Sequence, residues 1–438
     1  MRSAIALVLL AACGDGIGAP DATLGPDAAL GLVKVRYLGE GALALNAVFF
    51  LNADSSLVLA TRTSLDGTAN AYMADGGSVT IVIPRGGTQF MYTWLAVKSG
   101  DDLVVDERGS LITNELADFS IKIPADPAVE GFKLNSSCGA QDLTGADRFA
   151  VPALLSQCDG AADMLVYTLR SGSVESYLYR RDVPITRGGG VVFDEAYRPI
   201  DSATIRVTGV PPAVQAIFAG QALMGRSREL YGVQTASVPK GVGAQDGTIV
   251  PDNGTGTFTH AMPLPPTGTL ETTLDPEFDN VLCQQHVVVW GPPSAVTQIA
   301  YDARPLRRFH ERPTYLRDQN AIRWSEEPEG SSGDAVRTRM AWFRFDPNFN
   351  GQFDWQIVGP RGTEPILRLP VLPSPQLQPG SEFSSVQPFE LETIQADGGY
   401  DRIRPRIHGP WNLRPWPADG ASGRLDFMEL TPNSVPIE

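Results

Sequence analysis

The sequence predicts a mainly β protein built of several antiparallel β-sandwich domains in tandem. Short segments in which apolar and polar residues alternate recur along the chain, and this period of two is typical of strands with one buried face. The 438 residues include 44 glycines and 35 prolines, which favour turns over long helices. The clearest strand segments are VKVRYL (33–38), SVTIVIP (78–84), FSIKIP (119–124), ATIRVTGV (203–210), HVVVW (286–290) and AWFRF (341–345).

Helical patterns are few and short. The segment DRFAVPALLSQ (147–157) is the best example, and Pro152 interrupts it. Composition is that of a globular chain, with 42% hydrophobic and 19% charged residues. The net charge of −15 argues against nucleic acid as a partner, because neutralising phosphates requires a basic face.

The N-terminus predicts export. Residues 1–12 combine Arg2 with an apolar run of signal-peptide length, too short to span a bilayer. The run ends in Leu10-Ala11-Ala12-Cys13, which resembles the lipobox of bacterial lipoproteins. This resemblance implies a signal peptide over 1–12, a diacylglyceryl group on Cys13, membrane anchoring through that lipid and, because Gly14 follows, the outer membrane. The alternative is a short signal peptide with an incidental cysteine.

Residues 13–31 are expected to form a flexible tether. They contain the tandem hexapeptides PDATLG (20–25) and PDAALG (26–31). A composition so rich in proline, glycine and aspartate buries too little apolar surface to offset the entropy of ordering. The tether would hold a folded body away from the lipid headgroups.

The first folded unit is expected at 32–125. Its segment 32–83 resembles the carboxypeptidase regulatory-like and bacterial Ig-like modules of surface proteins: a strand, the residues Leu45, Ala47, Val48 and Phe50, a hairpin at NADSS (52–56) and a turn at TSLDGTA (63–69). The resemblance implies an Ig-like or prealbumin-like sandwich that serves as a scaffold or spacer. Gly67 is expected to supply the positive φ of the turn.

Three further β domains are expected, at 126–200, 201–297 and 298–438. The first contains Cys138 and Cys158, which we expect to form a disulfide, since an exported protein permits one. Cys283 is then left over and is expected to be buried and inert. The last domain contains no lysine but 16 arginines and five of the seven tryptophans.

FDPNFNGQFDW (345–355) resembles a calcium-binding loop. Oxygen-bearing side chains alternate along it, and calcium prefers six to eight oxygen ligands. The twelfth position, which normally carries a bidentate acid, is Ile357. The alternative is a plain β-hairpin turn, with no cofactor at all. The candidate ligands are Asp346, Asn348, Asn350, Gln352 and Asp354.

Arginine and tryptophan interleave in 304–324 and 402–416 of the last domain. Such residues can stack on sugar rings and pair with the acidic groups of an envelope polysaccharide. The alternative is an arginine ladder on an exposed sheet face that packs on aromatic rings and is balanced by neighbouring acids. The candidate sugar-binding residues are Arg307, Arg308, Trp324, Arg406, Trp411 and Trp416.

The sequence carries no catalytic signature, such as G-x-S-x-G or H-E-x-x-H. We therefore expect a lipid-anchored protein of the cell envelope that is a non-catalytic structural, adhesion or binding module. Its partner would be another surface protein or an envelope polysaccharide. A carbohydrate-binding lipoprotein is the first alternative. An envelope hydrolase with dispersed carboxylates is the second, because that pairing is spatial and not sequential.

Overall fold

Strands dominate the structure, a computed structural model. It describes residues 30–38, 45–106, 117–124, 131–137, 139–143, 148–153, 160–171, 173–186, 188–212, 214–225, 229–234, 254–278, 283–294, 296–303, 305–346, 349–379, 387–406 and 422–430. Four β-sandwiches follow one another along these ranges, which confirms the predicted fold class. We call them module 1 (31–106), module 2 (117–199), module 3 (201–300) and module 4 (309–430).

The four modules share one strand order. In modules 1, 2 and 3 the first strand lies in the middle of a small sheet, antiparallel to the fourth strand and parallel to the seventh. The facing sheet has the order third, second, fifth, sixth. Module 4 repeats the four-stranded order, but a strand that precedes its first strand, and is antiparallel to it, replaces the seventh.

In module 1 the predicted alternation sets the inward face. Val33, Val35 and Tyr37 of the first strand are buried, and their neighbours are not. The NADSS turn (52–56) joins two strands as predicted, and Gly67 has a φ of 78°, as its turn requires. The strands are β1 (Gly31–Leu38), β2 (Ala47–Leu51), β3 (Leu57–Arg62), β4 (Thr68–Met73), β5 (Gly77–Arg85), β6 (Thr88–Val97) and β7 (Asp102–Asp106).

Module 2 corrects one expectation. The short helix at 147–157 is wrong, because Arg148–Ala153 forms an edge strand, and an edge strand tolerates Pro152. A core that includes Phe119, Leu134 and Val166 fills the sandwich. The strands are β8 (Ala117–Lys122), β9 (Gly131–Ser136), β10 (Gly139–Leu143), β11 (Arg148–Ala153), β12 (Ala161–Arg170), β13 (Ser173–Pro184), β14 (Gly190–Val192) and the short β15 (Arg198–Pro199).

Module 3 encloses a core of its own, with Ile205, Ile217 and Leu274 among its buried residues. Its strands are β16 (Asp201–Thr208), β17 (Val214–Met224), β18 (Glu229–Gln234), β19 (Thr255–Met262), β20 (Thr269–Phe278), β21 (Cys283–Gly291) and β22 (Gln298–Ala300), followed by the 3₁₀ helix η5 (Tyr301–Ala303).

Module 4 contains the described α-helix, α1 (Gly399–Ile403). Neither α1 nor any other helix in the described ranges has the length and apolar character needed to cross a bilayer. The strands are β23 (Phe309–Leu316), β24 (Ala321–Glu326), β25 (Ala335–Asp346), β26 (Phe349–Pro360), β27 (Ile366–Arg368), β28 (Gln387–Ala396) and β29 (Gly423–Leu430), and the 3₁₀ helices are η6 (Arg317–Gln319), η7 (Pro375–Leu377) and η8 (Arg404–Arg406).

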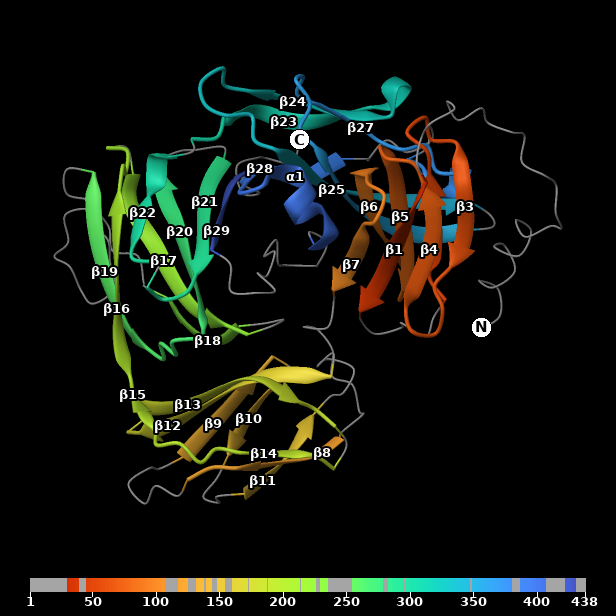
Figure 1. The fold of residues 1–438 in the computed structure, drawn as a ribbon. Coiled ribbons are helices and arrows are strands. Elements are labelled where there is room, and N and C mark those ends of the chain that lie inside the picture. The colour runs from red at the N-terminus through yellow and green to blue at the C-terminus, as the bar shows by residue number, and fades with distance from the viewer. Residues whose placement is uncertain are drawn as a thin grey trace.

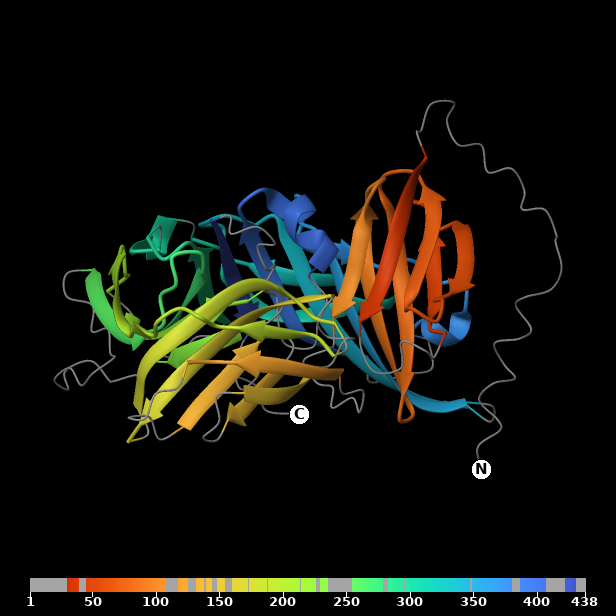
Figure 2. The same cartoon turned by 60° about the horizontal axis from the view of Figure 1, so that its bottom comes forward.

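The large sheets of modules 1, 3 and 4 join edge to edge into one sheet of twelve strands. Its order is β18-β17-β20-β21-β29-β28-β25-β26-β6-β5-β2-β3. Strand β6 pairs in parallel with β26, and β21 pairs antiparallel with β29. Module 4 therefore lies between module 3 and module 1 (Figure 1), while the larger sheet of module 2 remains separate, as the turned view shows (Figure 2).

Each face of the joined sheet is covered by different elements. On one face, Val358 and Ile394 of module 4 share a core with module 1 and α1. On the other, Trp342 and Trp355 pack under the sheet of β23, β24 and β27. The indole Nε1 of Trp355 donates a hydrogen bond of 2.8 Å to Thr93 of module 1, so the joint is also tied by side chains.

Two expected domain boundaries are displaced. Strand β8 begins module 2, so the first unit ends before 117 and not at 125. Strand β22 completes module 3, so the division at 297 falls just before its last strand. The expected start of a domain at 201 coincides with the start of β16. Cys283 is buried and unpaired, as expected.

Candidate functional site: charged clusters at the joints between modules

Trp324, a predicted sugar-stacking residue, is buried. Only 4% of its surface is exposed, and its Nε1 donates a hydrogen bond of 3.2 Å to Glu326. The guanidinium of Arg361 lies over the Trp324 ring, 5.0 Å from its centroid, and also contacts Glu326. No sugar can stack on this ring, so the assignment of Trp324 to a sugar-binding surface is wrong.

The remaining sugar-binding candidates do not gather into one described surface. Arg307 donates to the carbonyl of Gly330 at 3.2 Å and lies 3.4 Å from Glu326. Arg308 is half-buried and directly precedes β23. Arg406 ends η8, and its side chain lies outside the described set, as do Trp411 and Trp416 entirely.

This arrangement is of the kind that the alternative interpretation describes, although Arg361 lies outside the two arginine-rich segments 304–324 and 402–416. Arg361 packs on an aromatic ring and is balanced by Glu326, which also faces Arg307. Cation–π contacts of this kind stabilise a packed surface. The contact differs from the expected ladder in being buried rather than exposed.

The calcium-loop candidates lie on a β-hairpin. Strands β25 and β26 pair down to Asp346 and Phe349, with Asn350 opposite Phe345. An extended chain rises about 3.3 Å per residue, so Asp354 lies on the order of 17 Å along β26 from Phe349. The hairpin therefore draws Gln352 and Asp354 away from the turn.

Asp354 also has a different partner. It is buried, and it accepts two hydrogen bonds from Arg339, of 2.8 and 2.5 Å. The hairpin alternative fits these contacts, and the described residues include no group of three or more acids, histidines or cysteines arranged for a metal. Asn348 falls outside the described residues.

The predicted lipidation site and disulfide also fall outside the described residues. These are Cys13, Cys138 and Cys158. Their chemistry stays a prediction from the sequence.

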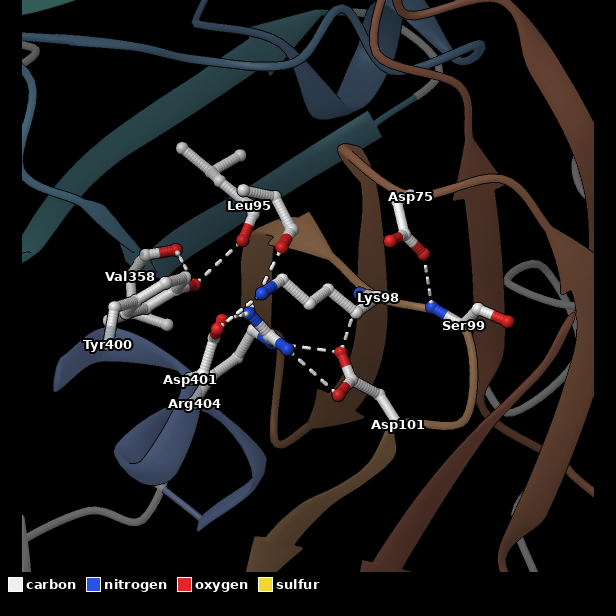
Figure 3. Close-up of polar contacts among 10 residues, drawn as sticks. Asp75, Leu95, Lys98, Ser99, Asp101, Val358, Tyr400, Asp401 and Arg404 are labelled. Atoms are coloured by element: carbon white, nitrogen blue, oxygen red, sulfur yellow. Dashed lines mark hydrogen bonds and ion pairs between the residues drawn. The ribbon is translucent and has the colours of Figure 1, made fainter. Parts of the chain in front are cut away.

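The densest described polar cluster lies where module 4 meets module 1 (Figure 3). Arg404 begins η8 and is only 2% exposed. Its Nε and Nη2 donate to the two oxygens of Asp101, at 2.8 and 2.9 Å, and its Nη1 donates to the carbonyl of Ala96 at 3.1 Å and to Asp401 at 2.6 Å. Lys98 contacts Asp401 from the module 1 side.

Tyr400 ties the same joint from within the core. Its hydroxyl lies 2.7 Å from the carbonyl of Leu95 on β6 and 3.3 Å from that of Val358 on β26, the two strands that pair across the joint. Burial raises the pKa of the Tyr400 hydroxyl, so it remains a donor at all physiological pH values. Arg404 lies over this ring, 5.2 Å from its centroid.

The charges in this cluster stabilise one another. Burial opposes the charge on Arg404, but the hydrogen bonds that Arg404 donates to Asp101 and Asp401, together with the negative charge of Asp101, outweigh burial and raise the pKa of Arg404. Hydrogen bonds from Lys98 and Arg404 lower the pKa of Asp401. Arg404 and Asp401 are therefore both charged at neutral pH.

A second group of charges crosses the same face of the joined sheet. Arg339 on β25 bridges Asp354 on β26 and Glu390 on β28, the latter at 2.9 Å. Arg337 contacts Glu392 on β28 at 2.6 Å. Burial raises the pKa of Glu392 against the opposing effect of Arg337, and its Oε2 has no hydrogen-bond partner in the described part of the chain.

His286 marks the joint between modules 3 and 4. Its Nδ1 lies 2.7 Å from Asp275 on β20, and its Nε2 lies 3.3 Å from Glu429 on β29. Burial disfavours a charge here, but the hydrogen bonds to Asp275 and Glu429 outweigh burial and raise the pKa of His286 to about 10. The imidazole is therefore a cation that links two modules at neutral pH.

Sequence reasoning missed these residues. Arg337 and Arg339 occupy alternate positions of the strand AVRTRMAWFRF (335–345), and this spacing could have placed both on one face. Nothing local indicates that Arg404 would face Asp101, because 303 residues separate them. These arginines face carboxylates within the protein, so the clusters are suited to holding strands and modules together.

Comparison with known proteins does not extend this interpretation. No protein-family model matches the chain, and no curated protein matches it. Among solved structures, the chain is similar to the TIE protein of Bacillus anthracis, with 15% identity over 57% of this chain and 45% of that chain and a TM-score of 0.15. The match spans less than half of that protein, and a similarity this low carries no argument about fold or function.

Proposed function

We propose that this protein is a lipid-anchored, non-catalytic component of the bacterial cell envelope, in which modules 1, 3 and 4 act as one rigid structural or binding body. The observation that carries the proposal is the joined sheet. Two modules that share a strand pair cannot move apart without breaking a row of backbone hydrogen bonds, each of which contributes about 1 kcal/mol.

The charged clusters support rigidity at both joints. Arg404 and Tyr400 link module 4 to module 1, and His286 links module 4 to module 3. Buried ion pairs contribute little net stability, but they can favour one relative orientation of the packed elements over the alternatives. Catalytic devices are commonly built on mobile loops, whereas most charges described here sit on paired strands or on the short helices packed against them. Lys98 and Asp101 lie in the four-residue turn between β6 and β7.

The anchor is argued from the sequence. Leu10-Ala11-Ala12-Cys13 supplies the lipidation signal, and residues 14–31 would place the rigid body at a distance from the outer membrane. Acyl chains contribute about 0.8 kcal/mol per buried CH₂, so a multiply acylated Cys13 would hold the protein permanently. The partner would be another surface protein or an envelope polysaccharide, with calcium not required.

Two experiments test the proposal. Radiolabelled palmitate should enter the wild-type chain and not the Cys13→Ser variant, whereas Cys283→Ser should be labelled normally. Equal labelling of wild type and Cys13→Ser would refute the anchor.

The rigid body is tested by cutting the chain. A specific protease site placed between 107 and 116 separates module 1 covalently from the rest. We expect the two fragments to elute together in gel filtration, since β6–β26 pairing and Arg404 hold them. Dissociation of the fragments under native conditions would show that the modules move independently, against the proposal.

A further inference from the structure

The joined sheet ends in an exposed edge strand. Strand β3 (Leu57–Arg62) closes the strand order, and in the described part of the chain it pairs only with β2. Three consecutive residues are exposed, Leu57 by 46%, Val58 by 36% and Leu59 by 38%. Since successive side chains point to opposite faces, both faces of β3 are open to solvent.

Strand β3 lacks the features that protect edge strands. Proline, a central charge and short length are the usual protections against pairing with another chain. β3 has six residues, LVLATR, and its single charge is Arg62 at the end. Elsewhere the exposed large apolar residues of the strands stand singly or in pairs, as Tyr72 on β4 and Val192 on β14 do.

Apolar side chains extend the exposed surface beyond β3 itself. Leu65 is exposed in the turn that follows the strand. Val371 is also exposed, and its N–H donates a hydrogen bond of 3.2 Å to Ser55, just before the strand. The consecutive exposed residues Leu57, Val58 and Leu59 form an apolar edge of the kind that marks an interaction site.

Edge strands of this chain already pair with edge strands of other modules. Twice, an edge strand of one module pairs with an edge strand of another, at β6–β26 and at β21–β29. The opposite end of the joined sheet is not equally open, because Asn135 of module 2 donates a 2.5 Å hydrogen bond to the Leu230 carbonyl of β18. Among the described strands, β3 is therefore the end of the joined sheet that is open for extension.

We propose that β3 pairs with β3 of a second copy of this chain, antiparallel about a two-fold axis, so that the joined sheet continues across a dimer. A two-fold axis perpendicular to the sheet keeps each face of the sheet on the same side in both copies. Because directly opposite residues point to the same face, one residue at the centre of the pairing must lie opposite itself in the second copy. The centre of β3 makes this residue Leu59 or Ala60. Centred on Leu59, it sets Leu57 opposite Thr61 of the second copy and Val58 opposite Ala60. One open edge gives a closed dimer, whereas two would give a fibre.

The first test is the mass of the full chain in detergent, measured by light scattering after gel filtration. We expect twice the 47.0 kDa chain mass for wild type. Leu59→Lys should raise the dissociation constant by roughly tenfold or more, because it places two like charges at the two-fold axis in the register centred on Leu59, or within one residue of it in the register centred on Ala60. Val192→Lys is the matched control, an exposed valine on another edge strand, and should remain dimeric.

A second test gives the register. Directly opposite residues of an antiparallel pair have Cβ atoms about 4.5–5.5 Å apart, close enough for a disulfide after small adjustments. Under oxidation, Leu59→Cys or Ala60→Cys should form an intermolecular disulfide at its two-fold position, and Val192→Cys should not. Far-UV circular dichroism and an unchanged melting temperature show that each variant is folded.

The outcomes are distinct. A wild-type chain that stays monomeric at tens of micromolar would overturn the proposal and leave the edge to a foreign partner. A dimer that persists in folded Leu59→Lys, or the absence of a cross-link at both 59 and 60, would place any interface elsewhere. Neither test involves Cys13, so failure here leaves the proposed anchoring and rigidity untouched.

Discussion

Replacing Arg404 with methionine should loosen the joint between modules 1 and 4. Methionine keeps much of the apolar volume but removes the guanidinium, which makes two hydrogen bonds to Asp101, one to the carbonyl of Ala96 and one to Asp401. Removing one partner of a buried ion pair typically costs 3–5 kcal/mol, because the other charge remains buried. Asp101 is 11% exposed and still accepts a 2.7 Å hydrogen bond from the Lys98 backbone, so we expect about 3 kcal/mol.

Native-state hydrogen exchange is the suitable assay, because a chain of four modules is not expected to unfold in one step. Arg404→Met should lower the opening free energy of the amides in α1 and β7. Arg402→Met is the matched control, two residues earlier on α1. Arg402 is exposed, and its 3.4 Å hydrogen bond to the carbonyl of Asp397 is weak, so its effect should stay within about 0.5 kcal/mol.

A double-mutant cycle isolates the pair. Asp101→Asn removes the charge that Arg404 faces, so the double variant should be less destabilised than the sum of the single ones, by about 1–3 kcal/mol. Exchange in Arg404→Met that differs from wild type by less than about 1 kcal/mol, or strict additivity in the cycle, would refute the assignment of this joint to the ion pair.

Two further predictions concern the joint between modules 3 and 4. Because the pKa of His286 is about 10 in the folded protein and 6.5 otherwise, its contribution is complete below pH 6.5 and is lost as the pH rises through 10. The difference corresponds to at most ~5 kcal/mol, and 27% exposure screens it to roughly 2–3 kcal/mol. Denaturation between pH 6 and 10 should show this loss in wild type and not in His286→Gln, and equal pH profiles would contradict it. Gly423→Ala would place a Cβ 2.3 Å from the ring of Trp290. The near-ultraviolet circular dichroism of this variant should therefore change, and its free energy of unfolding should fall by about 1–3 kcal/mol. Gly362→Ala is the control, because its Cβ meets no atom closer than 3.9 Å, and it should match wild type.

The strands could be predicted because their information is local. Alternation in 33–38 and 78–84 falls within β1 and β5, the segment 203–210 overlaps β16 (Asp201–Thr208), and the glycine at 67 has the positive φ its turn needs. The predicted helix at 147–157 is wrong because the local pattern is ambiguous. A short apolar run fits a helix or a strand equally well, and pairing with β8 decided the matter.

The candidate site could not be predicted in the same way. The interleaving of arginine and tryptophan predicts that Trp324 stacks on a sugar, yet Arg361, a residue 37 positions later, covers its ring. The position of an arginine relative to an aromatic ring depends on which strands pair, and period-two patterns do not specify partners. The same holds for Asp354, whose partner Arg339 comes from the neighbouring strand and not from the hairpin turn.

The joined sheet explains why this chain repeats one sandwich yet is not a string of independent domains. Each module of this type exposes the edges of its larger sheet, and an open edge is a template for association with other chains. Joining β6 to β26 and β21 to β29 removes four such edges within one molecule. What remains at the module 1 end is β3, apolar and unprotected. If the pairing that joins the modules is also the pairing that joins two copies, a single charge at Leu59 should separate the molecules while leaving β6–β26 and β21–β29 intact.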